Sequence, residues 1–297
     1  MAKLIAVDDF SPVIKVSVDS VECALPCTLL LGYGKPLKTD LLTACDSTDL
    51  IHVSALINSD KSDDSFLNKL YPTSQSRRIR LYHVLNSLDN MTESILACGV
   101  PSHVLNSEKK TLDHVQEAIK NNLVKSVYDG KEEQHLPITK VAVFPIEYTP
   151  FYDVALSDER ESLPLDQKVY FVDVMEKKTT VSGIENGVFA KQSDGSGLVE
   201  TFFIGRDLFY KEYSCDGDEE SIPEDIKDEY FSYLMTLLSI NFGIGKKERI
   251  YWSGIGAVFF ENQIKSGRNN RIIANPEFSK VRGLFKFAQQ KINHSQL

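Results

Sequence analysis

The stretch VYFVDVMEKKTTVSGI at residues 169–184 carries the pattern that decides the fold. Residues 169–174 are apolar except for Asp173, and their β-branched and aromatic side chains favour a buried strand over a helix. Polar residues at 175–178 predict a tight turn, and residues 179–184 predict the returning strand. The stretch is therefore predicted to be a β-hairpin whose first strand ends close to a carboxylate.

A second stretch, LIAVDDFSPVIKVSV at residues 4–18, has the same order of apolar strand, aspartate, polar turn and returning strand. Two similar hairpins about half a chain apart predict a duplicated α/β domain with a cleft between its halves. The charged connector at residues 158–166 is the expected boundary. We expect a first lobe at residues 1–160 and a second lobe at residues 161–274.

Composition and charge narrow the class of protein. A chain of 297 residues can form two cores, and 42% apolar with 25% charged residues is ordinary for a globular protein. We see no signal peptide and no apolar run that could cross a bilayer, so we expect a cytoplasmic protein without a membrane partner. The net charge of −9 argues against direct DNA binding. Five cysteines without metal-ligand spacing indicate buried, reduced thiols.

Further elements follow from periodicity and turn residues. Apolar spacing predicts a helix over residues 77–97, and Arg77, Arg78 and Arg80 are expected on its solvated face or at a subunit contact, with a DNA contact less favoured. A helix over 107–129 and a strand over 138–145, followed by Glu147, come next. The remaining elements are a helix that starts at a capping box (221–224), a strand (249–253) that enters a glycine turn, and a last helix from residue 275.

Three junctions between strand and turn carry polar residues that suit a nucleotide. Backbone N–H groups in turns bind phosphates, carboxylates hold Mg²⁺ through water, and glycines let the backbone approach a ligand closely. Each feature also has a structural explanation, because aspartates often end strands and a glycine turn can simply join a strand to a helix. The residues concerned are Asp8 with Ser11 and Lys15, Asp173 with Thr179 and Thr180, and Ser253 with residues 254–257.

In this order the junctions resemble the motifs of the actin-like plasmid-segregation proteins of the ParM/StbA family, in the actin, Hsp70 and sugar-kinase superfamily. The family's first phosphate loop, Asp-x-Gly-Ser/Thr-x-x-x-Lys, is matched by residues 8–15, and its second, Asp-x-Gly-Gly-Thr-Thr, by residues 173–180. Its adenosine motif, Gly-Gly-Gly-Ala, is matched by residues 254–257. The closing segment at 275–283 looks like the family's last segment, and the resemblance spans nearly the whole chain.

The resemblance implies an actin-like (ribonuclease H-like), two-lobed α/β fold with a nucleotide cleft and a C-terminal helix, 275–297, that returns to the first lobe. The short spacer between Gly197 and Glu224 implies a reduced outer subdomain in the second lobe. The implied ligand is ATP or GTP with Mg²⁺. By the same resemblance, Asp8 and Asp173 would hold the metal, and the phosphates would be contacted by Ser11, Lys15, Thr179 and Thr180. The base and ribose would be lined by Ser253, Gly254, Gly256 and Ala257. The catalytic residues would be Asp173 and Glu147, of which Glu147 would orient the attacking water.

The sequence departs from the family pattern at the phosphate loops. Phe10 replaces a glycine in the first loop, residues 175–178 replace the glycines of the second, and Ile146 stands where the water-positioning glutamate is expected. The resemblance implies a homopolymer filament that segregates plasmid or phage DNA through a small DNA-binding adaptor, with hydrolysis making the filament unstable. The departures leave open a scaffold that keeps the fold without hydrolysis. A small-molecule kinase is less favoured, because no second glycine-rich substrate loop is present.

Overall fold

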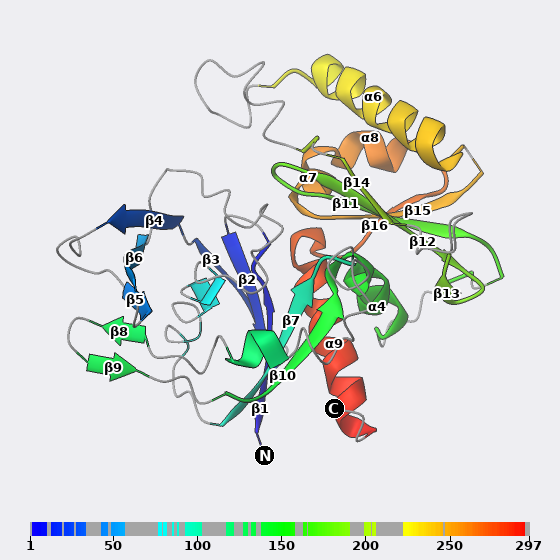
Figure 1. Ribbon diagram of the computed structural model, residues 1–297. Coiled ribbons are helices and arrows are strands. Elements are labelled where there is room, and N and C mark those ends of the chain that lie inside the picture. The colour runs from blue at the N-terminus through cyan, green and yellow to red at the C-terminus, as the bar shows by residue number, and fades with distance from the viewer. Residues whose placement is uncertain are drawn as a thin grey trace. The chain divides into compact units, whose positions relative to one another are not determined.

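A computed structural model gives the fold of the chain. It describes residues 2–10, 13–19, 21–26, 28–33, 43–46, 49–56, 77–78, 80–81, 85, 88, 93–102, 117–121, 127–129, 132–134, 138–157, 163–164, 166–190, 199–202, 204–205, 222–245 and 247–294. Two compact units are formed (Figure 1). Unit 1 comprises Met1–Ile146 with Leu284–Leu297, and unit 2 comprises Glu147–Gly283.

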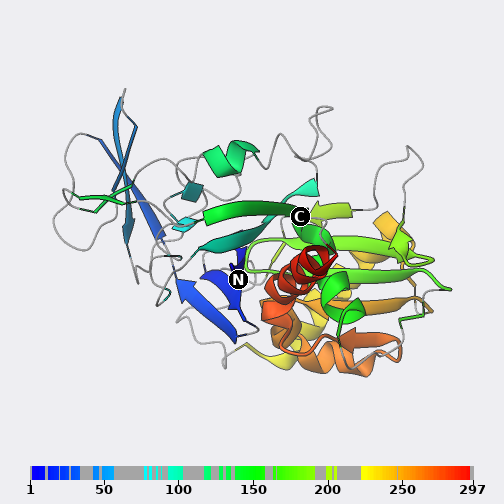
Figure 2. The same ribbon diagram turned by 90° about the horizontal axis from the view of Figure 1, so that it is seen from below.

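The main sheet of unit 1 is built around the N-terminal hairpin. Its strand order is β10-β7-β1-β2-β3, in which β1, β7 and β10 are parallel and β2 is antiparallel to both β1 and β3. Figure 2 shows β7 and β10 side by side, seen from below. The strands are β1 (Lys3–Asp8), β2 (Val13–Val18), β3 (Val21–Pro26), β7 (Ser94–Val100) and β10 (Ile138–Pro145).

The sheet of unit 2 repeats this arrangement around the second hairpin. Its order is β13-β12-β11-β15-β16, with β14 also paired to β12; β11, β15 and β16 are parallel, and β12 is antiparallel to β11. In both units the first hairpin strand is central, with its hairpin partner on one side and two parallel strands on the other. The strands are β11 (Val169–Val174), β12 (Thr179–Glu185), β13 (Val188–Phe189), β14 (Val199–Phe202), β15 (Arg249–Ser253) and β16 (Asn270–Ile272).

Unit 1 also contains a second sheet that the sequence pattern did not indicate. All its described pairings are antiparallel, in the order β4-β6-β5-β8-β9. Residues 117–121 are helical, as predicted, but 127–129 form a strand, so the predicted helix over 107–129 was too long. The strands are β4 (Thr28–Tyr33), β5 (Thr43–Asp46), β6 (Asp49–Leu56), β8 (Val127–Asp129) and β9 (Glu132–Gln134).

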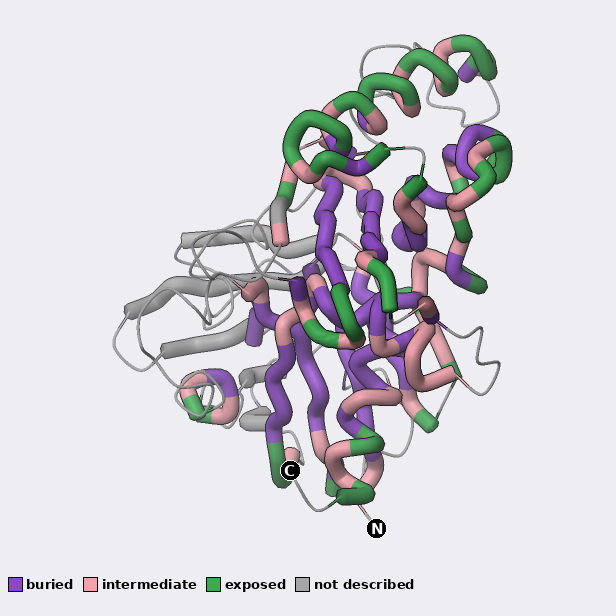
Figure 3. Tube along the Cα trace, turned by 90° about the vertical axis from the view of Figure 1, so that its right-hand side faces the viewer, coloured by how far each residue is buried: buried purple, intermediate pink, exposed green. Residues whose placement is uncertain are grey.

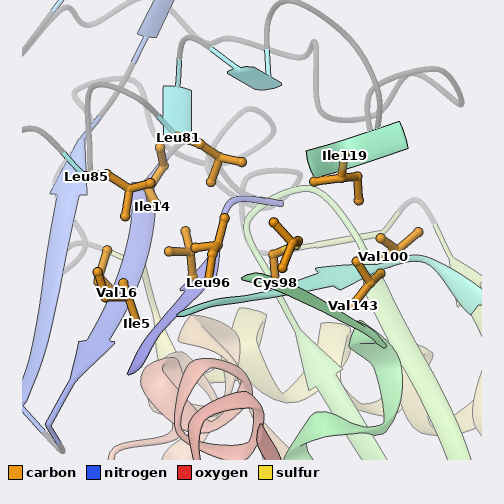
Figure 4. Packing of buried hydrophobic residues seen from close by; sticks show 12 residues of the cluster. Ile5, Ile14, Val16, Leu81, Leu85, Leu96, Cys98, Val100, Ile119 and Val143 are labelled. Carbon is orange, nitrogen blue, oxygen red and sulfur yellow. The ribbon is translucent and has the colours of Figure 1, made fainter. Parts of the chain in front are cut away.

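Each main sheet has a core of branched side chains. In unit 1, residues of β1, β2, β7 and β10 meet Leu81, Leu85 and Ile119 on one face (Figure 4). In unit 2 every residue of β11 is buried, because its side chains pack into a core on each face of the sheet. Figure 3 colours the trace by burial, and buried residues (purple) run along several neighbouring extended segments. Tyr170, Val172 and Val174 pack on the side of α6 and α8, whereas Val169 and Phe171 pack on the side of α4. A strand buried on both faces has a nearly continuous apolar sequence, as observed at residues 169–174.

Most described helices belong to unit 2. They are η3 (Ile146–Tyr148), α4 (Thr149–Ala155), α6 (Glu224–Phe242), α7 (Ile255–Phe259), α8 (Glu261–Ser266), η5 (Pro276–Phe278) and α9 (Ser279–Asn293), which continues into unit 1. Helix α6 ends at Gly243, which adopts the left-handed conformation that favours glycine. Among the described residues, no helix is both long and apolar enough to span a bilayer.

The helix predicted over residues 77–97 is wrong in its C-terminal part. The helix expected over 77–97 does not reach residue 97, because Ser94–Val100 is the parallel strand β7 with both neighbours paired. Of the predicted capping box, Ser221 lies outside the described residues; α6 begins at Glu224, and its N-cap residue Pro223 offers no side-chain cap. Residues 206–221, where the reduced outer subdomain was expected, also lie outside them.

Candidate functional site

The candidate site of unit 2 lies at the carboxyl end of β11, where Asp173 is almost completely buried. Side chains alternate along a strand, so Asp173 points to the same face as Val169 and Phe171. Ser253, the last residue of the parallel strand β15, lies directly opposite Asp173. The carboxyl ends of parallel strands are the usual place for ligand sites in α/β proteins.

Both oxygens of the Asp173 carboxylate have partners. The Ser253 hydroxyl donates a hydrogen bond to Oδ1 at 2.9 Å. The Lys280 ammonium lies 3.1 Å from Oδ2, and the two side chains are only 7% and 6% exposed. Lys280 also contacts the Met175 sulfur. The result is a buried ion pair between the sheet and the first turn of α9.

The glycine turn after β15 packs tightly against β11. Gly254 has φ +82°, and a Cβ at this position would lie 2.2 Å from the Val174 carbonyl oxygen. A Cβ on Gly256 would lie 2.2 Å from Val174 Cγ1. The Gly254 N–H donates to the Pro276 carbonyl at 2.8 Å. Close packing against β11 is therefore enough to explain why both positions are glycine. The predicted contacts of Gly254, Gly256 and the buried Ala257 with base and ribose stay predictions.

The turn between β11 and β12 is closed and partly covered by the chain itself. The Met175 N–H donates to the Lys178 carbonyl at 2.9 Å. A Cβ on Gly205 would lie 2.5 Å from both the Glu176 carbonyl oxygen and the Lys178 nitrogen, so the backbone at Gly205 lies directly against this turn. Little room is left around the turn's backbone at this point.

The two threonines that follow the turn direct their hydroxyls to protein partners. The Thr179 hydroxyl donates to the Ile204 carbonyl at 2.7 Å, and the Thr180 hydroxyl lies 3.4 Å from that of Thr201 on β14. A hydroxyl keeps acceptor capacity after donating one bond, but its single proton is used once. The predicted phosphate contacts of Thr179 and Thr180 therefore stay predictions.

Glu147 lies in the 3₁₀ turn after β10 and is half-buried. Its backbone carbonyl accepts a hydrogen bond from the Ser182 hydroxyl at 3.1 Å, which ties this turn to β12. Burial and the neighbouring Glu147 charge raise the pKa of Tyr148 to about 12. The structure thus places Glu147 beside β12, and its role in orienting water stays a prediction.

In unit 1, Asp8 ends β1 and is buried opposite Lys15 of β2, which is also buried. The Phe10 N–H donates to Asp8 Oδ1 at 3.3 Å. Phe10, which replaces the family's glycine, is 1% exposed, so its ring fills the interior. Ser11 lies outside the described residues.

Sequence reasoning missed the buried pair beside Asp8. Arg77 Nε lies 2.9 Å from Asp9 Oδ2, Arg77 Nη2 lies 3.0 Å from Asp9 Oδ1, and Nη2 also donates to the Gly99 carbonyl at 2.8 Å. Arg77, Arg78 and Arg80 are each at most 1% exposed, so the expected solvated face is wrong. One signal was available: Arg77 precedes the apolar Leu81 by four residues and hence shares its helical face.

No protein-family model and no curated protein matches the sequence. Solved structures do match over the full chain. The apo psk41 ParM protein is 13% identical with a TM-score of 0.69, covering 100% of this chain and 99% of that one. The chain has an actin-like fold. The predicted resemblance to ParM and the predicted two-lobed, duplicated architecture are thereby confirmed at the level of the fold.

Two further similar structures show this fold in different states. A 15-stranded ParM filament from Clostridium botulinum is 17% identical with a TM-score of 0.64, covering 97% of this chain and 99% of the other. The archaeal actin homologue Ta0583 in complex with ADP is 13% identical with a TM-score of 0.67, covering 98% of this chain and 100% of the other. Both therefore share the actin-like architecture along their whole length.

Mg²⁺, the metal that the resemblance to ParM implies, does not fit Asp173 as this residue is arranged. The Lys280 ammonium already neutralises this carboxylate at Oδ2 and would repel a second cation there, while Oδ1 accepts from Ser253. Across the described part of the chain, no cluster of three or more His, Cys, Asp and Glu side chains is placed to hold a metal ion. Positive charge at this carboxylate comes from the protein.

Proposed function

We propose that this protein assembles into nucleotide-dependent filaments that segregate plasmid or phage DNA through a separate DNA-binding adaptor. The observation that carries the proposal is the actin-like fold shared with ParM over the full chain, in crystal and filament forms alike. In this proposal the lobes are residues 1–160 with helix 275–297, and residues 161–274. The partner of each subunit is another copy of the same chain.

The proposed ligand is ATP or GTP. Asp8 and Lys15 in unit 1, and Asp173 with its turn in unit 2, each lie at the carboxyl end of a central parallel strand, where α/β sheets bind ligands. A similar structure, the archaeal actin homologue, contains ADP. These two supports, one from the chain and one from a relative in fold, favour a nucleoside phosphate over other ligands.

A separate DNA-binding adaptor is proposed because the chain itself is acidic. The chain carries a formal net charge of −9, and phosphate backbones are bound by clustered Lys and Arg. In the described part of unit 1, the three clustered arginines are buried and cannot present such a surface. A small basic protein in the cytoplasm that binds DNA on one side and the acidic filament on the other meets this requirement.

A non-hydrolysing scaffold that keeps the actin-like fold is the second candidate. Two observations favour it: Lys280 pairs with Asp173, and the backbone of Gly205 covers the β11–β12 turn. Hydrolysis needs an oriented water and stabilised charge on the transferring phosphoryl group, and both observations reduce access to the turn where that charge would be stabilised. The fold and self-assembly would be unaffected.

Sedimentation with parallel phosphate release tests the proposal and separates the candidates. The full-length protein is centrifuged with ATP, GTP, a non-hydrolysable analogue or no nucleotide, and the pellets are viewed by electron microscopy. Filaments only with nucleotide, together with phosphate release, support the first candidate. Filaments that form equally without nucleotide, with no phosphate release, support the scaffold.

A matched pair of variants controls this experiment. Lys15→Met removes a buried lysine opposite Asp8, whereas Lys265→Met removes an exposed lysine paired with Glu261. Loss of nucleotide-dependent assembly in the first variant only is expected. Equal behaviour of both variants, or an absence of filaments under every condition, contradicts the proposed function.

A further inference from the structure

We propose that the Lys280 ammonium takes, at Asp173, the place of the divalent cation of a metal-dependent nucleotide site. A nucleotide bound at the carboxyl end of β11 then needs no Mg²⁺ at this carboxylate. The inference deepens the proposed nucleotide function and rests on it for the identity of the ligand. The ion pair itself is a property of the chain and is tested separately below.

Both charges of this ion pair are buried. Asp173 and Lys280 are 7% and 6% exposed, and an isolated charge in such surroundings is strongly disfavoured. A buried carboxylate therefore needs a cation, and the sequence provides one within 3.1 Å of Oδ2. With the Ser253 hydroxyl on Oδ1, the carboxylate is satisfied on both oxygens. A metal ion at this carboxylate would therefore compete with the Lys280 ammonium for the same negative charge.

The fold fixes the start of α9, which carries Lys280. Arg282 forms a forked ion pair with Asp153 of α4, with Nε at 3.1 Å from Oδ1 and Nη2 at 2.7 Å from Oδ2. The backbone at Gly283 lies so close to α4 that a Cβ there would stand 1.8 Å from the Thr149 carbonyl oxygen. On the other side, Pro276 accepts the Gly254 N–H at 2.8 Å. Three contacts of the surrounding segment therefore hold the backbone that carries Lys280.

An ammonium differs from a metal ion in its chemistry. Lys280 supplies the positive charge that neutralises Asp173, and its ammonium also contacts the Met175 sulfur. It has no coordination sphere and does not lower the pKa of a bound water as a metal ion does. A site with Lys280 in this place favours nucleotide binding over rapid hydrolysis, in agreement with the covered turn at Gly205.

Thermal unfolding of the nucleotide-free full chain tests the ion pair alone. Melting temperatures are measured in excess Mg²⁺ and in EDTA for the wild type, Lys280→Ala, Lys280→Arg and the double variant Lys280→Ala/Asp173→Asn. We expect Lys280→Ala alone to gain about 3 °C or more from Mg²⁺, because the bared carboxylate then has room for the ion. Lys265→Ala, which removes an exposed ion pair, is the matched control and should behave as the wild type.

Nucleotide binding by the same proteins tests the consequence. Dissociation constants of fluorescent ATP and GTP analogues are measured in Mg²⁺ and in EDTA. For the wild type and Lys280→Arg we expect the two conditions to differ by less than about threefold, and for Lys280→Ala by about tenfold in favour of Mg²⁺. Wild-type affinity that falls tenfold or more in EDTA, with the same dependence in Lys280→Ala, overturns the inference and leaves the proposed function standing.

The two assays separate the two proposals. If no variant binds nucleotide, the proposed ligand is wrong, and the melting temperatures still decide about Lys280. A Mg²⁺ response in Lys280→Ala only supports the assignment; an equal response, or none, in wild type and Lys280→Ala overturns it. Should Lys280→Ala not fold in EDTA, recovery of folding by Mg²⁺ or by the added Asp173→Asn change supports the inference, and failure of both contradicts it.

Discussion

Asp9 and Arg77 form a two-point ion pair in the interior of unit 1, with Nε–Oδ2 at 2.9 Å and Nη2–Oδ1 at 3.0 Å. Both side chains are at most 1% exposed, and the guanidinium also lies 5.1 Å from the centre of the Phe10 ring. The pair joins the end of β1 to the helical residues at 77–78 and, through Gly99, to β7. Removing one partner leaves the other charge buried and uncompensated.

Arg77→Met should therefore lower the free energy of unfolding by about 3–5 kcal/mol. Denaturant unfolding followed by circular dichroism measures this change. The exposed pair of Lys265 and Glu261 provides the control, because Lys265→Met should cost less than about 1 kcal/mol. A loss below about 1 kcal/mol for Arg77→Met as well would show that the Asp9 charge finds another partner or is neutralised.

Gly254→Ala should be far more destabilising than Gly243→Ala. Both glycines have positive φ, +82° at Gly254 and +66° at Gly243. An alanine at either position is therefore strained by about 1–3 kcal/mol. At Gly243 nothing lies within 4 Å of an added Cβ, whereas at Gly254 the Val174 carbonyl oxygen stands at 2.2 Å. Unfolding free energies of the two variants measure the difference. Equal losses of unfolding free energy would mean that the carboxyl end of β11 moves aside for the added methyl group without strain.

The hairpins were predictable because a strand buried on both faces has a distinctive composition. The run at residues 169–174 has no helical periodicity, and its two neighbours in the sheet, β12 and β15, are short segments bounded by turn residues. The apolar spacing from Leu81 to Leu88 is helical, and Ile95 continues the same spacing by coincidence. The predicted helix over 77–97 therefore ran into β7, where tertiary pairing prevails over local pattern.

The positions of Asp8, Asp173 and the Gly254 turn followed from strand ends alone, whereas their partners did not. Lys280 precedes Leu284 by four residues and shares its buried face, yet a lysine near the start of an amphipathic helix is ordinarily solvated. Its contact with Asp173 joins residues more than a hundred positions apart. Such a pairing depends on how α9 packs on unit 2, which no local sequence pattern records.

Ser253→Ala should cost more than Ser182→Ala, although both remove one buried hydroxyl donor. Ser253 donates to the Asp173 carboxylate at 2.9 Å, and hydrogen bonds to charged groups contribute about 1.5–3 kcal/mol. Ser182 donates to a neutral carbonyl, that of Glu147, at 3.1 Å, and such bonds contribute about 1 kcal/mol. Denaturant unfolding of the two variants checks the order. The reverse order would indicate that Lys280 alone satisfies the carboxylate.

Cys98 should make the stability of the protein depend on alkaline pH. Burial raises the pKa of this thiol from 9.0 to about 11, although the Arg77 guanidinium acts in the opposite direction. Between these values the folded state keeps a proton that the unfolded state has lost, so stability is complete below pH 9.0 and decreases as the pH rises to about 11. A shift of two pKa units corresponds to roughly 2–3 kcal/mol.

The measurement compares the wild type with Cys98→Ala at several pH values, because groups such as Tyr148, whose pKa is also raised, contribute equally to both proteins. Cys98→Ala removes the titrating thiol, so the difference in unfolding free energy between the two proteins should shrink by roughly 2–3 kcal/mol across this range. Thiol-labelling reagents should correspondingly modify Cys98 only after unfolding, since the reactive thiolate is suppressed in the folded chain. A constant difference, or rapid labelling of Cys98 in the folded protein, would show that this thiol reaches solvent.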